Sequence, residues 1–172
     1  MSVVLPDLNP AAWALRRGKA GPLGARWRPK RVVTQQAALA SLYSTLPARL
    51  PALYESLVLT YRWAEVEIGS CALLANPPGP GLVGLLAEIT KDPAFVATLL
   101  PKGFIPFGRG SGGEYDPICF DTASSPGSGE SRIVQLEHED ILCRGRITVV
   151  SEVAPSFRSL VLQAIGPSVA AV

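Results

Sequence analysis

The sequence predicts an α+β fold, in which a mixed, mostly antiparallel sheet is flanked by helices in a single domain with an irregular basic N-terminal arm. In several segments, apolar residues recur every three or four positions, which is typical of amphipathic helices. Other short apolar runs are bounded by turn residues, which is typical of strands. The 172 residues are 48% hydrophobic and 17% charged, so the chain can bury one sizeable core.

The charge is distributed unevenly, and this divides the chain into an arm, residues 1–33, and a domain, residues 34–172. Residues 1–54 hold eight Lys or Arg against one acid, a net charge of +7, whereas residues 55–172 hold eight against thirteen, a net charge of −5. Interspersed glycines and prolines disfavour a regular helix in the arm. The basic residues concerned are Arg16, Arg17, Lys19, Arg26, Arg28, Lys30 and Arg31.

Three interpretations of the arm remain open. Lys and Arg neutralise phosphates and Trp13 and Trp27 can stack on bases, so the arm is a candidate nucleic-acid contact. Packing across the acidic body of its own domain is the favoured interpretation. A mitochondrial transit peptide is the third interpretation, although such a segment should be rich in serine and only Ser2 precedes Ser41.

The first half of the domain predicts helices around one strand. Thr34 can cap a helix that carries Leu39, Leu42, Tyr43 and Leu46 and ends before Pro47. Apolar residues at positions 50, 53, 54, 57, 58 and 61 predict a second helix, with proline at 51 in its first turn. Alternation over 64–74 predicts a strand with a bend at 69, and helices follow at 82–89 and from 93 to about 100.

The second half predicts strands and a closing helix. Short apolar runs at 104–107, 117–121, 133–136 and 147–150 are the expected strands. Residues 122–131 are rich in Ser and Gly and predict an exposed hairpin loop, and Arg144 with Gly145 predicts a turn. A helix is expected from Pro155 to residue 165.

A glycine cluster at residues 108–113 invites comparison with a phosphate-binding loop. It lacks the Gly-Lys-Ser/Thr ending, and a strand follows it instead of a helix, so we expect a tight strand-to-strand turn. The expected turn residues are Gly108, Gly110, Gly112 and Gly113.

The sequence offers little for catalysis. Cys119, as a nucleophile, would need His138, the one histidine, beside it, and its apolar neighbours indicate a core residue instead. Residues 137–140 could ligate a metal only if they converged, which adjacent strand residues do not, so a solvated strand end or loop is favoured. A glycosidase carboxylate pair cannot be distinguished from acids expected by chance. We therefore expect a protein that is not an enzyme, with no catalytic residue, no metal and no cofactor.

The sequence predicts no membrane association. The longest uncharged stretch, residues 68–87, contains three prolines, which cannot continue as one spanning helix. No basic region followed by an apolar run opens the chain, and the three cysteines show no disulfide or zinc spacing, so a cytoplasmic location is expected.

Gly-Phe-Ile-Pro-Phe-Gly at 103–108, the glycine cluster, and Glu-Tyr-Asp-Pro-Ile-Cys-Phe-Asp at 114–121 resemble the SUKH superfamily of toxin-immunity and cell-wall-regulator domains. Helical segments at 50–57 and 156–160 and the run at 133–140 match in order, so the resemblance covers about residues 46–162. Two departures are Tyr61-Arg62-Trp63, where the family often has Asn-Gly, and residues 1–33, which have no counterpart.

The resemblance implies an α+β domain that binds a protein without catalysis, commonly as a bacterial antidote in the cytoplasm. The implied mechanism is occlusion of a toxin, a nuclease or deaminase with a basic groove, by an acidic surface. The alternative function is a nucleic-acid-associated regulator that uses the basic arm. The expected partner-binding residues are Glu114, Asp116, Asp121, Glu137, Glu139 and Asp140.

Overall fold

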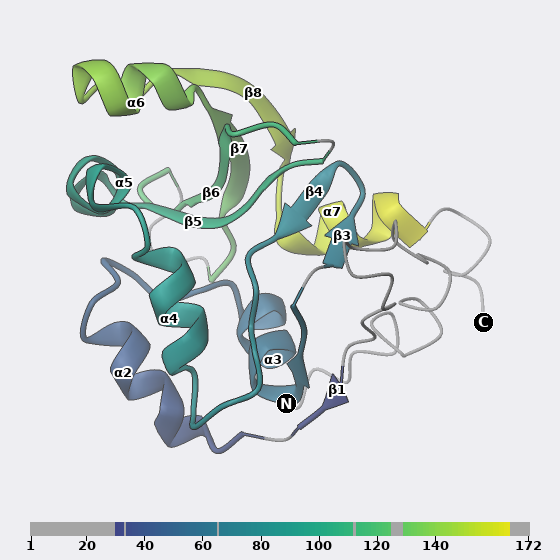
Figure 1. Ribbon diagram of the computed structural model, residues 1–172. Coiled ribbons are helices and arrows are strands. Elements are labelled where there is room, and N and C mark those ends of the chain that lie inside the picture. Colours follow the sequence, from purple (N-terminus) through teal and green to yellow (C-terminus); the bar gives the residue numbers. More distant parts are fainter. Residues whose placement is uncertain (1–29, 33, 65, 112, 125–128, 166–172) are drawn as a thin grey trace.

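The computed structural model describes residues 30–32, 34–64, 66–111, 113–124 and 129–165. These residues form an α+β fold, which confirms the expected class (Figure 1). Every pair of neighbouring strands in the described part is antiparallel, so the sheet is not mixed. None of the described helices is long and apolar enough to span a membrane.

The described residues form eight helical segments and eight strands. The helices are η2 (Gln36–Ala38), α2 (Leu39–Tyr43), α3 (Ala52–Thr60), α4 (Val83–Ile89), α5 (Pro93–Leu99), η3 (Leu100–Lys102), α6 (His138–Arg144) and α7 (Phe157–Ile165). The strands are β1 (Lys30–Arg31), β2 (Tyr61–Arg62), β3 (Val66–Ile68), β4 (Cys71–Leu73), β5 (Phe104–Gly110), β6 (Pro117–Asp121), β7 (Arg132–Leu136) and β8 (Val149–Ala154).

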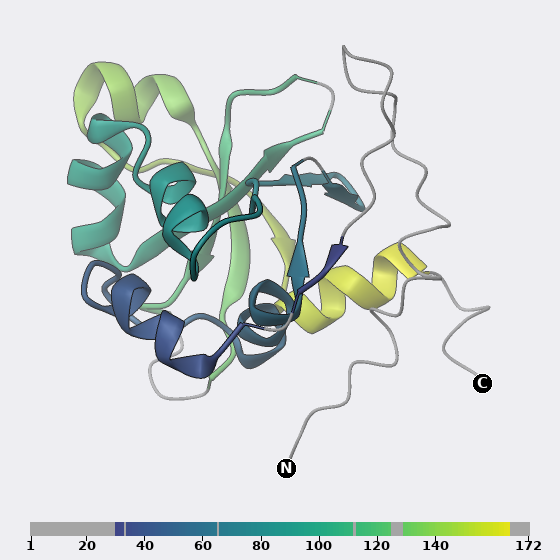
Figure 2. The ribbon, with the colours of Figure 1, turned by 60° about the horizontal axis from the view of Figure 1, so that its bottom comes forward.

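The main sheet has the order β3-β4-β5-β6-β7-β8, so each strand lies beside its predecessor in the chain. Figure 2 shows helices on both sides of this meander. Buried residues of α2, α3, α4 and α7 pack on one face of the sheet and form the larger core with it. On the other face a smaller core contains Leu99 from the end of α5 and Ile141 from α6. The β4–β5 connection contains α4, α5 and η3, and the β7–β8 connection contains α6, so these helices are inserted between paired strands.

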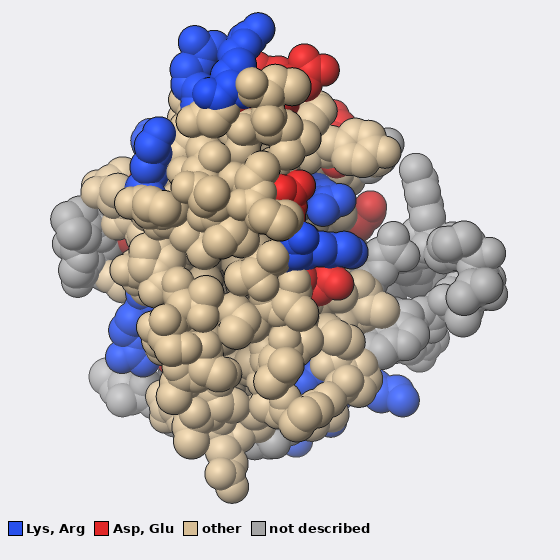
Figure 3. Space-filling model, turned by 60° about the vertical axis from the view of Figure 1, so that its left-hand side comes forward, with Lys and Arg blue, Asp and Glu red and all other residues tan. Residues whose placement is uncertain are grey.

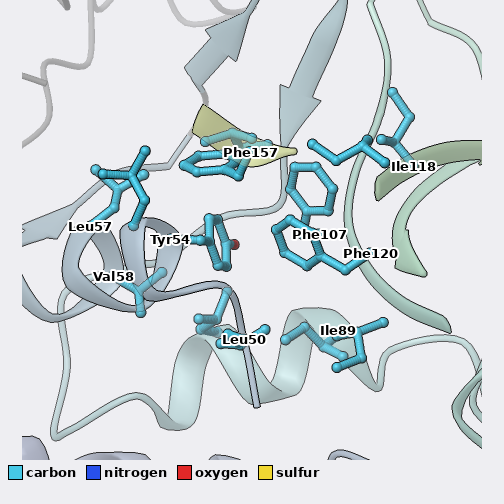
Figure 4. Close-up of a cluster of buried hydrophobic side chains, with 14 of the residues drawn as sticks. Leu50, Tyr54, Leu57, Val58, Ile89, Phe107, Ile118, Phe120 and Phe157 are labelled. Atoms are coloured by element: carbon cyan, nitrogen blue, oxygen red, sulfur yellow. The ribbon is translucent and has the colours of Figure 1, made fainter. Parts of the chain in front are cut away.

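Four aromatic rings occupy the centre of the larger core (Figure 4). Phe107 of β5 stacks on Phe120 of β6, with ring centroids 3.9 Å apart and an angle of 10°. Tyr54 of α3 meets Phe107, Phe120 and Phe157 of α7 edge to face, at 5.5, 5.2 and 5.2 Å. Such pairs contribute about 0.5–1.5 kcal/mol each beyond the area they bury. The cluster therefore fastens two helices to the two strands that carry the resemblance.

Several expected helix boundaries are confirmed. Asp92 caps α5 by accepting hydrogen bonds from the backbone N–H groups of Ala94 and Phe95, with Pro93 in the first turn. Gly103, with φ of +81°, ends the helical segment in the left-handed conformation. The helix predicted over 50–61 is α3, slightly shorter at each end.

Other expectations are wrong in detail. Thr34 is not a helix cap, because its hydroxyl accepts a hydrogen bond from Arg62. The strand expected over 64–74 is the β3–β4 hairpin, turned at Gly69 with φ of +63°. Residues 138–140 begin helix α6 and are not a strand end. The last helix begins at Phe157, not at Pro155.

The domain begins before residue 34. β1 pairs with β2, and the amide of Val32 donates to the carbonyl of Thr60 at 2.8 Å. Arg62, only 1% exposed, fixes this corner by donating to the backbone carbonyls of Val58 at 2.5 Å and Gly81 at 2.9 Å. Lys30 and Arg31 thus belong to the folded domain, whereas arm residues 1–29 lie outside the described residues.

Gly108 lies inside β5 and not in a turn, which corrects the expectation for this residue. A Cβ atom there would overlap the sulfur of Cys71 and stand 2.8 Å from the carbonyl oxygen of Ala72 on β4. Glycine is therefore required because β4 and its side chains approach β5 closely.

We expect Gly108→Ala to lower the free energy of unfolding by about 1–3 kcal/mol, because the strands must separate to admit the methyl group. Gly79→Ala is the matched control, because a Cβ there meets nothing within 4 Å, and its effect should stay within about 0.5 kcal/mol. Urea unfolding of both variants checks this. Equal stability of Gly108→Ala and the wild type would contradict the described strand approach.

Candidate functional site

One end of the sheet gathers most of the expected binding residues. β6 begins where β7 ends, since the strands are antiparallel, so residues 114–116 lie beside residues 135–139. We call this surface the β6–α6 patch. Its members are Glu114, Tyr115, Asp116, Gln135, Glu137, His138 and Glu139.

Asp116 and His138 hold the patch together. Oδ1 of Asp116 lies 2.6 Å from Nδ1 of His138 and also accepts the His138 backbone N–H at 3.1 Å. Its Oδ2 accepts from Nε2 of Gln135 at 3.2 Å. Partial burial raises the pKa of Asp116, but the hydrogen bonds from His138 and Gln135 outweigh this, so the pKa lies below 3.8. Asp116 is therefore an ionised carboxylate at neutral pH that ties β6 to the start of α6.

The glycines of the cluster shape this end of the sheet. A Cβ at Gly110, within β5, would overlap the carboxylate of Glu114 and lie 2.8 Å from its Cβ. Glu114 can therefore fold back, and its Oε2 accepts from Gln135 at 3.2 Å. Gly113 has φ of +93°, as expected for a turn residue, whereas Gly110 is a strand residue and Gly112 lies outside the described residues.

Tyr115 projects from the patch. It is 69% exposed, more than any other large hydrophobic side chain in the described part of the chain. Its ring centroid lies 5.9 Å from that of His138. Tyrosine combines large apolar area with few rotatable bonds, and it is enriched among the residues that dominate binding energies. Its sequence context gave no signal of this exposure.

Glu114, Glu137 and Glu139 supply the charge of the patch. Glu114 and Glu139 are exposed and Glu137 is partly exposed. No Lys or Arg among the described residues forms an ion pair with any of the three. None of the three carboxylates therefore has a close ionic partner among those residues.

Two expected binding residues are not on this surface. Asp121, 3% exposed, lies at the opposite end of β6, where Nε and Nη2 of Arg132 contact its Oδ2 at 2.8 and 2.7 Å. Asp140, 2% exposed, pairs with Arg144 at 2.6 Å and with Arg146 at 2.8 Å. Both carboxylates are buried and paired within the fold, so Asp121 and Asp140 are not available as the partner-binding residues that the sequence predicts.

Asp140 organises the connection from α6 to β8. The hydroxyl of Thr148 and the guanidinium groups of Arg146 and Arg144 donate to it, and together they lower its pKa from 3.8 to about 2. The backbone of Arg146 also donates to the Asp140 carbonyl at 3.1 Å. This network fixes the helix that displays Glu137, His138 and Glu139.

Cys119 lacks the surroundings of a nucleophile. Cys119 is buried between Leu99, Val134 and Leu136, and burial raises the pKa of its thiol well above 9.0. A nucleophilic cysteine needs the opposite shift. No group of three or more His, Cys, Asp or Glu among the described residues could hold a metal ion.

Comparison with protein-family models, with curated proteins and with solved structures gives no match. The resemblance to the SUKH superfamily therefore rests on the residues quoted for it.

We expect Asp140→Asn to be less stable than the wild type at pH 7. With a folded pKa of about 2 and an ordinary value of 3.8, the carboxylate stabilises the fold fully above pH 3.8 and loses this effect as the pH falls through 2. The stability gap between variant and wild type should therefore narrow from about pH 4 towards pH 2 in urea unfolding.

Glu139→Gln, at the adjacent exposed position, is the control and should stay within about 0.5 kcal/mol of the wild type throughout. A gap for Asp140→Asn that does not change with pH would show that the carboxylate is not ionised and paired as described.

Proposed function

We propose that this chain is a non-enzymatic protein-binding module of the SUKH type, which neutralises a basic toxin in the cytoplasm. The toxin class implied by the resemblance is a nuclease or deaminase whose active-site groove is basic. The observation that carries the proposal is the exposed Tyr115, which lies beside His138 on a surface whose three glutamates form no ion pair with any described Lys or Arg.

The segment that carries the resemblance, residues 103–121, contains both buried and exposed side chains, and this distribution supports the proposed function. Its apolar residues Phe107, Ile118 and Phe120 are buried in the core, each at most 1% exposed. Its polar residues Glu114 and Tyr115 remain in solvent. A segment that only stabilised the fold would have no need for an aromatic side chain on the outside, so these exposed residues favour a contact with another molecule.

The electrostatics of the patch favour a basic partner. Three carboxylates without a close ionic partner attract a positively charged groove over a distance of about 8 Å at physiological salt. Such a field raises the rate of association, while the desolvated aromatic contact slows dissociation. The β6–α6 patch would occlude the groove without forming or breaking a bond.

His138 has a positioning role in this proposal. Its ring and its backbone are both engaged by Asp116, which holds the first turn of α6 against β6. The imidazole thus orients Glu137 and Glu139, and the proposal assigns it no proton transfer.

The test is affinity capture from native lysate with the full chain and with a version that begins at Lys30, each with and without nuclease, followed by mass spectrometry. We expect one stoichiometric protein partner, retained by both versions and by nuclease-treated samples. Capture that requires nucleic acid or residues 1–29 would contradict the proposal and favour the nucleic-acid regulator.

With the captured partner purified, the double variant Glu137→Lys/Glu139→Lys should bind about tenfold more weakly or worse, and so should Tyr115→Ala, which corresponds to about 1.4 kcal/mol or more. Glu67→Lys/Glu88→Lys is the matched control, because it makes the same charge change on β3 and α4, outside the patch. Isothermal titration calorimetry measures all three. Equal losses for both double variants would show a general charge effect and would contradict binding through the patch.

A further inference from the structure

Three described glutamates without a close ionic partner lie together in the β6–α6 patch: Glu114, Glu137 and Glu139. Five other described carboxylates each pair with a Lys or Arg, namely Glu55, Glu88, Asp121, Asp140 and Glu152. Figure 3 shows that the side of the molecule that carries α2, α4 and α5 consists largely of uncharged residues. The patch is therefore the acidic target that the described surface offers to a basic segment.

The chain has a basic segment of its own in arm residues 1–29, which lie outside the described residues. They hold five Lys or Arg against one acid, a net charge of +4. Trp13 precedes these cations and Trp27 lies among them. Guanidinium groups pair with carboxylates and stack on aromatic rings, so this composition is complementary to glutamates around the exposed Tyr115. The cations are Arg16, Arg17, Lys19, Arg26 and Arg28.

The fold fixes the point at which the arm is attached. Lys30 begins β1, which pairs with β2. An extended chain spans about 3.4 Å per residue, so Lys19 can lie up to about 37 Å and Arg16 up to about 48 Å from Lys30. A domain of this size has a radius of gyration of about 14 Å, so the cations at 16, 17 and 19 can reach the patch from β1. The two cations nearest Lys30 are too close to it to do so.

We propose that residues 16–19 of the arm bind the β6–α6 patch of the same chain and compete there with the partner. The effect on the partner rests on the proposed function, whereas the contact itself does not. Exposed ion pairs are individually weak, but a tether keeps the arm at an effective concentration in the millimolar range. The arm therefore covers the patch for part of the time, which lowers the apparent affinity for the partner without preventing binding.

The test is carbodiimide crosslinking of the full chain in low and in high salt, followed by peptide mass spectrometry. The reagent joins an amine to a carboxylate that it contacts, and Lys19 is the one lysine of residues 1–29. We expect a bond from Lys19 to one of the three patch glutamates in low salt and its loss in high salt, because salt screens exposed charges. Lys91 and Glu88, 3.8 Å apart, are the internal standard and should be joined in both conditions. A mixture of isotope-labelled and unlabelled chains shows whether the bond lies within one chain.

Arg16→Gln/Arg17→Gln should reduce the Lys19 bond several-fold, and this variant should bind the captured partner about twofold to fivefold more tightly, because the patch is then free for more of the time. Lys102→Gln/Arg158→Gln is the matched control, because it removes the same number of positive charges from exposed positions outside the arm and the patch. It should change neither the bond nor the affinity.

Absence of the Lys19 bond while the Lys91–Glu88 bond forms would overturn the proposal. So would Lys19 bonds mainly to Glu67 on β3 or mainly between chains, or a partner affinity that the arm variant leaves unchanged. A Lys19 bond to the patch with no partner captured would contradict the proposed function alone. A partner that binds the patch in a chain without such a bond would contradict this inference alone, so the two proposals fail separately.

Discussion

The contact between Phe107 and Phe120 is the interaction on which the rest of this fold depends. The two rings stack across neighbouring strands, and Tyr54 and Phe157 close on them from two helices. Phe107 stands at the register shift of β5, where Pro106 pairs with Cys119 and Gly108 pairs with Ile118. Phe107 is the unpaired residue of this bulge, and it lies in the larger core together with Ile105, two positions before it. Helix layer and sheet are thereby fixed to each other through a few buried side chains.

The position of the β6–α6 patch follows from this core. With Phe120 fixed, β6 places Asp116 just before its first residue, at the end where β7 leads into α6. His138 then lies within hydrogen-bond distance of Asp116. Residues 114–121 therefore have two roles. Their apolar side chains pack in the core and fix the register of β6, and this register places their polar side chains at the surface. Asp140, which pairs with Arg144 at the end of α6 and with Arg146 after it, keeps that surface in place.

Much of this fold is predictable from local sequence patterns. The periodicity from Leu50 onward identifies α3, the Asp92–Pro93 pair identifies the start of α5, and the apolar run from 117 to 121 gives β6 with its observed bounds. These signals are local and strong. The β3–β4 hairpin was missed because a bend at Gly69 fits the sequence as well as a reversal does. The buried positions change phase there, from Val66 and Ile68 to Cys71 and Leu73, and this is the signal of the reversal.

The site is less predictable, because burial of an acid depends on partners elsewhere in the chain. Arg132 pairs with Asp121 from the directly opposite position on β7, and Thr148 reaches Asp140 from the far end of the connection. One signal was available: Asp140 and Arg144 have the i, i+4 spacing of a helical ion pair. Arg62 gave no signal, since its partners are backbone carbonyls and a hydroxyl from three separate segments.

Hydrogen–deuterium exchange of the full chain, alone and with its captured protein partner, tests the central claim most directly: that the partner is bound at the end of the sheet where β6 and α6 meet. The account predicts slower amide exchange in residues 113–118 and 136–144 on binding, with α2 and α4 unchanged. Protection confined to α2, α4 and α5, with none at the β6–α6 patch, would contradict it.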